Sequence, residues 1–458
     1  MKKNVVFVFS DQWRWCDHGY AGNKEVKTPN LDDLAAESVH FTHAVATMPV
    51  CSPWRASFLT GQYPLTHGLF LNDLRLNTKA TPLAEVFSQA GYDTAWIGKW
   101  HIDGTGRDQH IPKERRRGFE HWRVLECTHN YKHSEYFAGD EAQKRTWPGY
   151  DAYAQTDEAI TYLQSRAKEK PFLLCLSFGP PHDPYRMCPE DLLEHYDGKT
   201  LTFRPNVPEA SRAAAKSTYA GYYAHIDALD QCMGKLLAAL KVSGQLENTV
   251  FVYTSDHGDM LHSHGMLKKQ RPWDESIRVP LLIRLPGGKA RTITGPIGTP
   301  DLMPTLLGLC GLDIPKTVEG RNLASVVQGK RKWDDDAALI LCPAPFGEWL
   351  RKSGGREYRG VRTARYTYVR DISGPWLLYD NQEDPYQQTN RVGDPALKSV
   401  QADLEKKLAV KLKATGDTFL PADELIRRCG YKTDPSGTVD YQNKTRWGQE
   451  TVSARATV

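Results

Sequence analysis

Apolar residues along the first two thirds of the chain form short continuous runs, which alternate with longer segments of periodic hydrophobicity. The short runs are rich in β-branched and aromatic residues, which predicts strands buried on both faces. These runs cover residues 4–9, 92–97, 172–178, 249–254 and 279–285. Apolar residues recur at helical spacing in the longer segments, which cover residues 29–38, 82–90, 152–164, 219–240 and 300–309. This alternation predicts an α/β fold with a large, mostly parallel sheet flanked by helices.

The pattern changes near residues 333–336. Short strand-like runs follow at residues 358–363, 366–370 and 376–379, and a periodic segment covers residues 397–412. Closely spaced short runs predict an antiparallel hairpin or meander, here followed by a helix. We therefore predict an N-terminal α/β domain over residues 1–333. A smaller C-terminal subdomain would cover residues 334–458, with a small antiparallel sheet, a helix and a polar tail.

Composition narrows the class of protein. The 458 residues are 40% hydrophobic and 25% charged, which excludes a disordered or fibrous chain. The 59 Lys and Arg residues nearly balance the 55 Asp and Glu residues, and the net charge is +4. This balance excludes a dedicated nucleic-acid binder, although it is compatible with a local basic pocket for an anion. The nine cysteines form no C-x-x-C pair, so no zinc ribbon or thioredoxin-type site is expected.

No apolar run reaches the roughly 20 residues that a membrane-spanning helix needs. Lys2 and Lys3 precede the first apolar run, but that run ends at Ser10 and is too short for the apolar core of a signal peptide. The sequence as it stands predicts a cytoplasmic protein, or a periplasmic or secreted one whose signal peptide has been removed.

Charged, amide and imidazole side chains directly follow four of the predicted strands. They are Asp11 and Gln12, Lys99 and His101, His182, and Asp256 and His257. The carboxyl ends of parallel strands share one edge of a sheet, and ligands of open α/β sheets bind at that edge. We therefore expect these side chains to meet in one site, although charged residues commonly follow strands and any single case carries little weight.

Four of these residues are candidates for a metal site: Asp11, Gln12, Asp256 and His257. Two carboxylates match the charge of a divalent cation, and an amide oxygen suits a hard metal such as Ca²⁺ or Mg²⁺. Imidazole binds transition metals more often than it binds Ca²⁺ or Mg²⁺, so Mn²⁺ is an alternative identity for the metal. The alternative is that Asp256 caps a turn and that His257 lies on the surface.

The sequence around Cys51 is the most specific signal in the chain. Cys51 begins the pentapeptide C-S-P-W-R, which ends at Arg55, and Thr60-Gly61 follows five residues later. A cysteine near an arginine is compatible with a nucleophile of low pKa, and a buried structural thiol is the alternative. The pattern C-x-P-x-R followed by T-G resembles the signature of the type I sulfatases of the alkaline phosphatase superfamily. In that family the cysteine is oxidised to formylglycine after translation.

The resemblance extends over about residues 4–390. Residues 4–22 resemble the first strand and metal loop of the family, and residues 98–101 (G-K-W-H) resemble its second signature. Residues 255–258 (S-D-H-G), with His264 and Lys268 downstream, resemble its second metal segment, and residues 379–390 resemble a C-terminal LYD…DP…N stretch. The resemblance is weakest over residues 104–150, which look like a specificity insertion.

The resemblance implies that Cys51 becomes a formylglycine whose hydrate is the nucleophile, and that Arg55 orients it. It also implies a maturation partner, a formylglycine-generating enzyme. The implied ligands of Ca²⁺ are Asp11, Gln12, Asp256 and His257. Many family members carry Asp in place of Gln12 and Asn in place of His257, so Mg²⁺ and Mn²⁺ stay open as alternatives.

The resemblance implies four further catalytic residues. Lys99 and Lys268 would bind the sulfate oxygens, His101 would assist collapse of the enzyme–sulfate intermediate, and His182 would be the general acid at the leaving group. A sulfate monoester is anionic and repels an anionic nucleophile. A dication and two lysines would neutralise its oxygens as charge moves toward the leaving group.

The insertion at residues 104–150 bears on the substrate. Its basic residues include the run 115–117 (R-R-R) and the candidate substrate-binding residues Arg107, His110, His129 and His133. An arginine run is usually a solvated face, but residues of this kind in a pocket would suit further sulfates or a uronate carboxylate. With the usual range of the family, this favours a sulfated carbohydrate, a polysaccharide or an oligosaccharide, as substrate.

Other functions stay open from the sequence. A phosphodiesterase or phosphonate monoester hydrolase of the same superfamily can share the cysteine motif, and an aryl or choline sulfatase would use the same chemistry. A non-catalytic binding protein on the same scaffold is the third class, but such a protein would be expected to have lost some of these side chains. The sequence does not determine which sugar, which hydroxyl, exo or endo action, or the oligomeric state.

Overall fold

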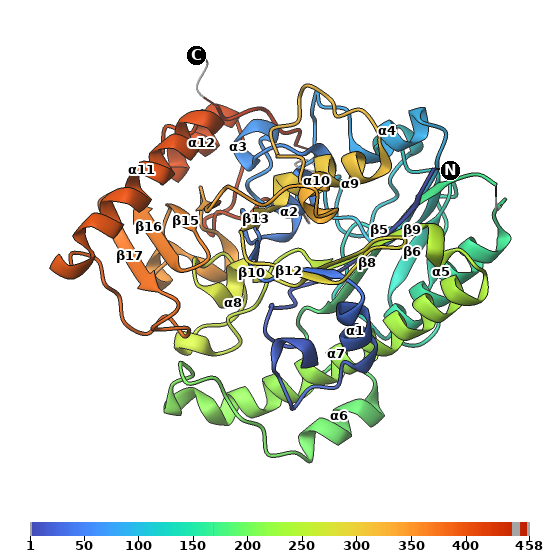
Figure 1. Cartoon of the computed structure of the whole chain (residues 1–458), viewed down its shortest axis with the longest axis horizontal. Coiled ribbons are helices and arrows are strands. Elements are labelled where there is room, and N and C mark those ends of the chain that lie inside the picture. Colours follow the sequence, from blue (N-terminus) through green and yellow to red (C-terminus); the bar gives the residue numbers. More distant parts are fainter. Residues whose placement is uncertain (1, 168, 442–448, 456–458) are drawn as a thin grey trace.

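A ten-stranded mixed sheet runs through the centre of the protein, with helices above and below it (Figure 1). The structure is a computed structural model that describes residues 2–167, 169–441 and 449–455. The strand order is β12-β2-β11-β9-β1-β8-β4-β5-β6-β7. Its five central strands are all parallel: β9 (Thr249–Ser255), β1 (Asn4–Asp11), β8 (Phe172–Pro181), β4 (Asp93–Lys99) and β5 (His121–Leu125). The predicted α/β fold with a large, mostly parallel sheet is confirmed.

The outer strands of this sheet include antiparallel pairs, which the hydrophobic pattern did not predict. On one side β11 (Leu281–Arg284) lies antiparallel to both β9 and β2 (Val39–Phe41), and β12 (Arg291–Ile293) pairs with β2 at the edge. On the other side β6 (Glu135–Ala138) and β7 (Lys144–Thr146) continue the sheet as antiparallel strands. Runs of apolar residues indicate burial but not strand direction, so the hydrophobic pattern does not distinguish antiparallel from parallel pairs.

The strand predicted over residues 279–285 is divided in two at Pro280. β10 (Arg278–Val279) joins a separate three-stranded sheet with β3 (Ala44–Val45) and β13 (Ile297–Gly298), and β11 joins the large sheet. Proline has no N–H to donate to a strand partner, so it is suited to the point where the chain passes from one sheet to the other.

Two apolar cores cover the two faces of the large sheet. Along β1, Phe7 and Phe9 belong to one core while Val6 and Val8 belong to the other, because successive side chains of a strand point to opposite faces. The first core is closed by α2 (Cys51–Thr60), α4 (Leu83–Gln89) and α9 (Leu302–Cys310). The second is closed by α1 (Pro29–Ala36), α5 (Asp151–Ser165) and α7 (Arg212–Val242).

A four-stranded antiparallel sheet forms the C-terminal part of the chain, on the left of Figure 1. Its strands are β14 (Ala338–Cys342), β15 (Tyr358–Arg362), β16 (Tyr366–Asp371) and β17 (Gly374–Asp380), and α11 (Lys398–Thr415) packs against β15 and β16. The predicted meander and helix are present, whereas β14 and α12 (Ala422–Cys429) were not predicted. The domain boundary after residue 333 stays a prediction.

Short helices complete the connections. The remaining α-helices are α3 (Pro64–His67), α6 (Glu190–Asp197), α8 (Asp274–Ile277) and α10 (Ala324–Val327). The 3₁₀ helices are η1 (Gly19–Ala21), η2 (Lys113–Arg115), η3 (Glu209–Ser211), η4 (Leu246–Asn248), η5 (Ser263–Gly265), η6 (Thr299–Asp301), η7 (Gly347–Trp349), η8 (Arg351–Ser353) and η9 (Pro395–Leu397).

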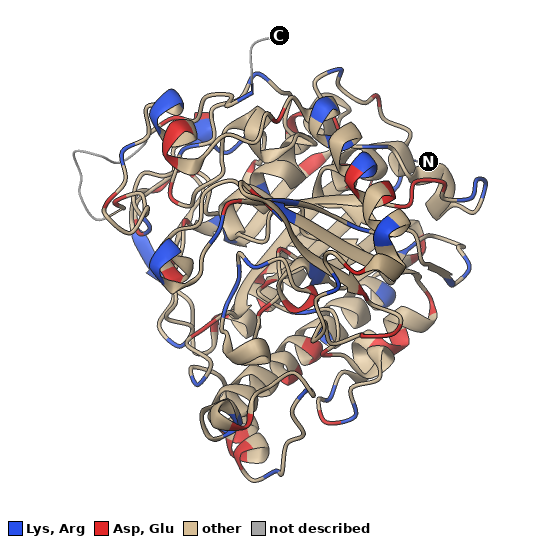
Figure 2. Ribbon diagram, turned by 90° about the vertical axis from the view of Figure 1, so that its left-hand side faces the viewer, with Lys and Arg blue, Asp and Glu red and all other residues tan. Residues whose placement is uncertain are grey.

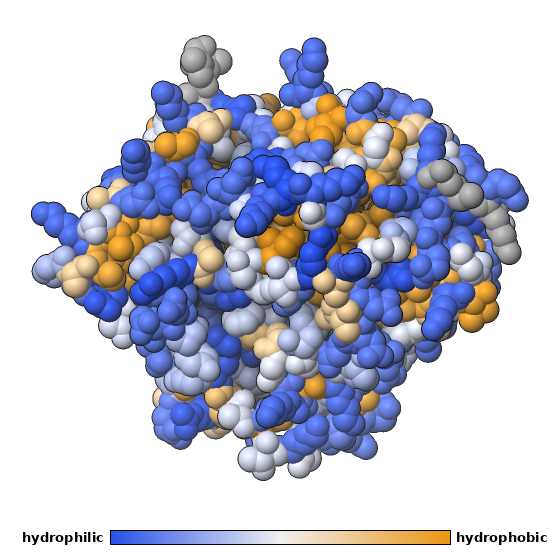
Figure 3. Space-filling model, in the orientation of Figure 1, coloured by the Kyte–Doolittle hydropathy of each residue, from blue (hydrophilic) through white to orange (hydrophobic). Residues whose placement is uncertain are grey.

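Charged residues of both signs are distributed over the fold. Lys and Arg are interspersed with Asp and Glu around the ribbon (Figure 2), in keeping with the small net charge. The face shown in Figure 3 is mainly hydrophilic, and its hydrophobic residues lie in separate patches. Among the described residues, every helix is too short or too polar to cross a bilayer.

Candidate active site

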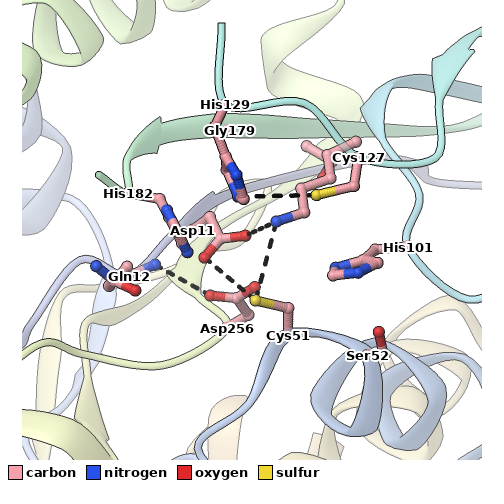
Figure 4. Close-up of polar contacts among 12 residues, drawn as sticks. Asp11, Gln12, Cys51, Ser52, His101, Cys127, His129, Gly179, His182 and Asp256 are labelled. Atoms are coloured by element: carbon pink, nitrogen blue, oxygen red, sulfur yellow. Dashed lines mark hydrogen bonds and ion pairs between the residues drawn. The ribbon is translucent and has the colours of Figure 1, made fainter. Parts of the chain in front are cut away.

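The polar residues that follow the central strands meet at one edge of the sheet (Figure 4). Asp11 and Lys99 are the last residues of β1 and β4, while His182 and Asp256 directly follow β8 and β9. Cys51 is the first residue of α2 and points into the same space. The parallel central strands all end on this side, so residues far apart in the chain lie together.

Cys51 is buried at the centre of this cluster. Its Sγ lies 3.3 Å from Nε2 of His257, 3.5 Å from Nζ of Lys269, 3.6 Å from Oδ1 of Asp11 and 3.9 Å from Nζ of Lys99. Burial and the Asp11 carboxylate raise the pKa of the Cys51 thiol to about 12, despite the two lysines. The thiol is therefore protonated at neutral pH, which does not favour a cysteine thiolate as the nucleophile.

Arg55 and Lys99 neutralise the buried carboxylates beneath Cys51. One terminal nitrogen of Arg55 lies 3.3 Å from Asp256 and 3.5 Å from Asp11, and the other donates to the Lys99 carbonyl at 2.7 Å and to Ser177 Oγ at 2.8 Å. The Lys99 ammonium lies 2.5 Å from Asp11. Burial by itself would raise the pKa of Asp11, but the charges around it, above all Lys99, lower that pKa well below its usual range.

The donor set at this point fits a divalent cation. Single ligand atoms of Asp11, Cys51, Asp256 and His257 all lie within 4.8 Å of one another, and all four residues are buried. Nδ1 of His257 donates to the Gly258 carbonyl at 2.9 Å, which leaves Nε2 as the bare nitrogen. Burial also lowers the pKa of His257, so its imidazole is in the neutral form that binds metals.

Gln12, the fourth predicted metal ligand, lies beside this group in a left-handed backbone conformation, with φ 73°. Its amide oxygen accepts a hydrogen bond from Lys269 at 3.1 Å, and its amide nitrogen donates to Asp259 at 2.8 Å. The amide oxygen is thus oriented by its neighbours and lies on the side of Lys269.

Of the two adjacent lysines, Lys269 reaches Cys51 and Lys268 does not. The Lys268 ammonium lies 3.4 Å from an Asp183 oxygen, and its side chain is 35% exposed. Lys269 is 4% exposed and its ammonium contacts Cys51, Gln12 and His182. Lys268 adopts a left-handed φ of 65°, so a local backbone feature decides which of two adjacent lysines enters the site.

His182 lies against Lys269 and His129. Its Nδ1 donates to the Asp183 carbonyl at 2.8 Å, and its Nε2 accepts from the Lys269 ammonium at 2.6 Å. Burial and the charge of Lys269 lower the pKa of His182 well below its usual range, so this imidazole is neutral. The His129 ring stacks on it at a centroid distance of 4.6 Å and lies 3.8 Å from the Cys127 sulfur.

The insertion at residues 104–150 contributes unevenly to the site. Arg107 binds Asp73, which also binds His101. His110 instead packs edge-on against Phe137, and His133 is exposed. In the arginine run, Arg116 is buried against Asp140 and two backbone carbonyls. Arg115 and Arg117 are partly exposed, and they bind Asp103 and the Leu76 carbonyl.

Sequence reasoning missed four residues that shape the site: Lys269, Asp73, Asp259 and Ser177. Lys269 could have been found as the other half of a Lys-Lys pair, and Asp259 as an acid two residues beyond His257. No local pattern marks Asp73, which comes from a loop and reaches the site only through the tertiary fold.

Comparison with known proteins gives a consistent result. A family model described as Sulfatase matches residues 3–312, and a model described as N-sulphoglucosamine sulphohydrolase, C-terminal, matches residues 262–414. The chain is 43% identical to an ulvan-active sulfatase of Formosa agariphila, over 94% of this chain and 85% of that protein. It is 33% identical to an endo-4-O-sulfatase of Bacteroides thetaiotaomicron, over 93% and 95% of the two chains.

The fold also matches solved structures. One structure from Bacteroides thetaiotaomicron, described in connection with the metabolism of multiple glycosaminoglycans, has a TM-score of 0.83 at 30% identity. The match covers 93% of this chain and 99% of that one. The two chains therefore share their fold over most of their length.

Proposed function

Because this chain belongs to the sulfatase family, whose members hydrolyse sulfate esters, we propose that it releases sulfate from a sulfated carbohydrate, a polysaccharide or an oligosaccharide. The observation that carries the proposal is the position of Cys51. This residue of the C-x-P-x-R motif lies buried among two carboxylates, an imidazole and two lysines. Hydrolysis of a sulfate ester needs a nucleophile next to sulfur and positive charge around the sulfate oxygens, and this cluster combines the two.

Cys51 supplies the position of the nucleophile. Oxidation to formylglycine replaces the sulfur by oxygen on the same Cβ, so Sγ marks the place of an aldehyde or hydrate oxygen. When formed and hydrated, formylglycine supplies two hydroxyls, one to attack sulfur and one to expel sulfate as the carbonyl re-forms. Arg55, held by Ser177 and the Lys99 carbonyl, places its positive charge against the two carboxylates beside this position. A formylglycine-generating enzyme would be the maturation partner.

Lys99 and Lys269 are the proposed ligands of the sulfate oxygens. Their ammonium groups lie 3.9 and 3.5 Å from Sγ of Cys51. Each is already held by a hydrogen bond, Lys99 to Asp11 and Lys269 to Gln12, so little reorganisation is needed when charge develops. Because both side chains are buried, their attraction for the sulfate is screened less than it would be in water.

His182 and Lys269 form the proposed proton donor to the leaving-group oxygen. His182 is neutral and its Nε2 accepts a hydrogen bond from Lys269. We therefore assign proton donation to the hydrogen-bonded pair, in which Lys269 carries the proton, instead of to an isolated imidazolium. His101 is the proposed base for the hydroxyl at position 51.

We propose Ca²⁺ as the metal. Asp11, Asp256, Nε2 of His257 and the amide oxygen of Gln12 would hold it, with carboxylate and amide oxygens in the majority. When bound, the cation supplies positive charge that stabilises the anionic substrate and the developing negative charge. Elemental analysis of the purified protein should find stoichiometric calcium, and stoichiometric manganese or magnesium in its place would contradict this assignment.

The proposed substrate class is supported by the relatives and by two residues of the insertion at residues 104–150. Two relatives, at 43% and 33% identity, are described as active on ulvan and as an endo-4-O-sulfatase. Arg107 and His129, from the insertion, reach residues of the site. An arginine and a stacked histidine suit the further anionic groups of a sulfated sugar.

The first experiment is a peptide mass spectrum across residue 51, on protein produced together with a formylglycine-generating enzyme. We expect the mass of the aldehyde or its hydrate, and sulfate release from a panel of sulfated oligosaccharides but not from phosphodiesters. Cys51→Ala should abolish release. Aldehyde at position 51 with turnover of phosphodiesters only, or of aryl or choline sulfates only, would overturn the proposed substrate class. Full activity of Cys51→Ala would overturn the nucleophile.

A further inference from the structure

Asp73 holds two residues of the site with one carboxylate. Its Oδ1 lies 3.2 Å from Nε2 of His101 and 2.9 Å from Nε of Arg107, and its Oδ2 lies 2.9 Å from Nη2 of Arg107. Asp73 is 4% exposed, so these bonds replace water around a buried charge. Charge-assisted and bidentate bonds of this kind are among the strongest that side chains make, and they fix orientation as well as distance.

The bond to Asp73 sets the tautomer of His101. An ionised carboxylate only accepts hydrogen bonds, so Nε2 of His101 carries the proton and Nδ1 is bare. Nδ1 is buried and has no hydrogen-bond partner among the described residues. The ring points toward the side on which Cys51 lies (Figure 4). A histidine with one bare ring nitrogen is the form that can accept a proton.

The same carboxylate fixes one edge of Arg107. Nε and Nη2 form that edge, so Nη1 lies on the opposite side of the planar guanidinium and away from Asp73. The Tyr441 ring covers the guanidinium at 3.8 Å from its carbon, and the Arg107 side chain is 24% exposed. Arg107 is therefore held rigidly while part of it stays accessible, as a group that binds an incoming anion must be.

The loop that carries Asp73 is fixed to the helix that carries Cys51. The side-chain oxygen of Asn72 accepts from the backbone N–H of Ser52 at 3.1 Å, and Leu76 N–H donates to the Ile102 carbonyl at 2.8 Å. Asp73 thus has a defined position relative to both Cys51 and His101. It touches no reacting atom and acts only through its two partners.

We propose that Asp73 is a positioning residue that couples proton transfer at position 51 to recognition of a second anionic group on the sugar, a carboxylate or another sulfate. It sets the tautomer of His101 and the direction of Arg107 together. The inference rests on the proposed sulfatase reaction and adds to it a substrate with two anionic groups. Loss of the carboxylate should therefore lower kcat through His101 and raise KM through Arg107.

The test variant is Asp73→Asn in the matured enzyme. Asp73 has φ 64°, and asparagine tolerates this left-handed conformation, so the change removes the charge without adding backbone strain. We expect kcat to fall about 10- to 100-fold on both 4-nitrophenyl sulfate and a disulfated oligosaccharide, within the range of general acid–base effects. KM should rise about 10-fold for the oligosaccharide only, which corresponds to the loss of one charge-assisted contact.

A double-variant cycle separates the two routes. In the Arg107→Ala background, Asp73→Asn should no longer raise KM but should still lower kcat, because the arginine route is already lost. Asp103→Asn is the matched control, since Asp103 is an equally buried acid that pairs with Arg115 and does not touch His101 or Arg107. It should leave both constants within about twofold, as expected of a carboxylate outside the site.

A direct readout in the unsubstituted protein uses ¹⁵N NMR of the histidine side chains, with the His101 signals assigned by their loss in His101→Asn. We expect a protonated Nε2 and a bare Nδ1. A protonated Nδ1 would overturn the proposal, and so would Asp73→Asn with both constants unchanged in a folded enzyme. If the matured protein with an aldehyde at position 51 releases no sulfate, the proposed function fails instead, while the NMR result still tests the role of Asp73.

Discussion

At the scale of single residues, adjacent positions in the chain have opposite environments. Lys268 pairs with Asp183 near the surface, whereas the Lys269 ammonium lies 3.5 Å from Sγ of Cys51 and 2.6 Å from His182. The family resemblance implied Lys268, and the structure brings its neighbour to the site. A resemblance of short segments locates a functional residue only approximately. Here an error of one position replaces the buried Lys269 by the partly exposed Lys268.

The two lysines give a matched pair of substitutions. We expect Lys269→Ala to lower kcat/KM for sulfate esters by about 10²- to 10³-fold, because a preorganised charge next to the reacting group is lost. Lys268→Ala should change it less than about threefold, as expected of a partly exposed ion pair. Steady-state kinetics on the matured enzyme measure both changes. A larger loss of kcat/KM in Lys268→Ala than in Lys269→Ala would return the catalytic role to Lys268.

At the scale of elements, the site depends on how closely β4 approaches β8. Gly98 has φ 102°, and a Cβ added there would lie 2.1 Å from the Ser177 carbonyl oxygen. Ser177 accepts from Arg55, and Lys99 follows Gly98 directly. Gly98, the penultimate residue of β4, therefore allows the two strands to approach closely. As a result Lys99 of β4 and Ser177 of β8, which binds Arg55, lie at one point.

Gly98→Ala should destabilise the protein by about 2 kcal/mol or more, because it combines an unfavourable φ with a steric clash against backbone. It should also abolish most of the activity by displacing Ser177 and Lys99. Gly91→Ala is the control: its φ is 82°, but the nearest atom to an added Cβ is the mobile end of Lys2 at 4.0 Å. For both variants, thermal unfolding measures the change in stability and kcat measures the change in activity. Full activity in Gly98→Ala would contradict the steric argument.

At the scale of the whole molecule, the C-terminal sheet is joined to the α/β part by buried charges. Asp274, in α8, accepts two bonds of 2.8 Å from Arg362 of β15 and one of 2.9 Å from Arg278. The Asp274 and Arg362 side chains are 3% and 1% exposed. Burial would raise the pKa of Asp274, but Arg362 and Arg278 lower it below its usual range. The C-terminal sheet and the α/β part therefore share a buried ionic contact, which lies across the boundary predicted after residue 333.

Arg362→Met tests this contact. We expect a loss of about 3 kcal/mol in unfolding free energy, since removal of one partner leaves part of a buried carboxylate charge uncompensated. Arg370→Met, which breaks a partly exposed pair between Arg370 of β16 and Glu405 of α11, should cost less than about 1 kcal/mol. Calorimetry should show one transition for the unsubstituted protein and both variants. Two separate transitions would indicate that the C-terminal part unfolds independently.

Some of the site was already determined by the sequence. Apolar runs bounded by polar residues defined the central strands, because burial on both faces requires continuous hydrophobicity and the chain must turn polar where it leaves the sheet. Asp11, Lys99, His182 and Asp256 were therefore predictable at one edge. Cys51 was predictable from its local motif, and the structure places it among them.

Other features were decided only by the tertiary structure. The direction of β11, the strand β14 and the tail residue Tyr441 over Arg107 depend on pairings between distant segments. The choice of Lys269 depends on a local left-handed turn, and the role of Asp73 depends on a loop that packs against α2 and the segment after β4. Hydrophobic periodicity encodes which residues are buried, whereas hydrogen-bond partners and side-chain directions are fixed only when separate elements pack together.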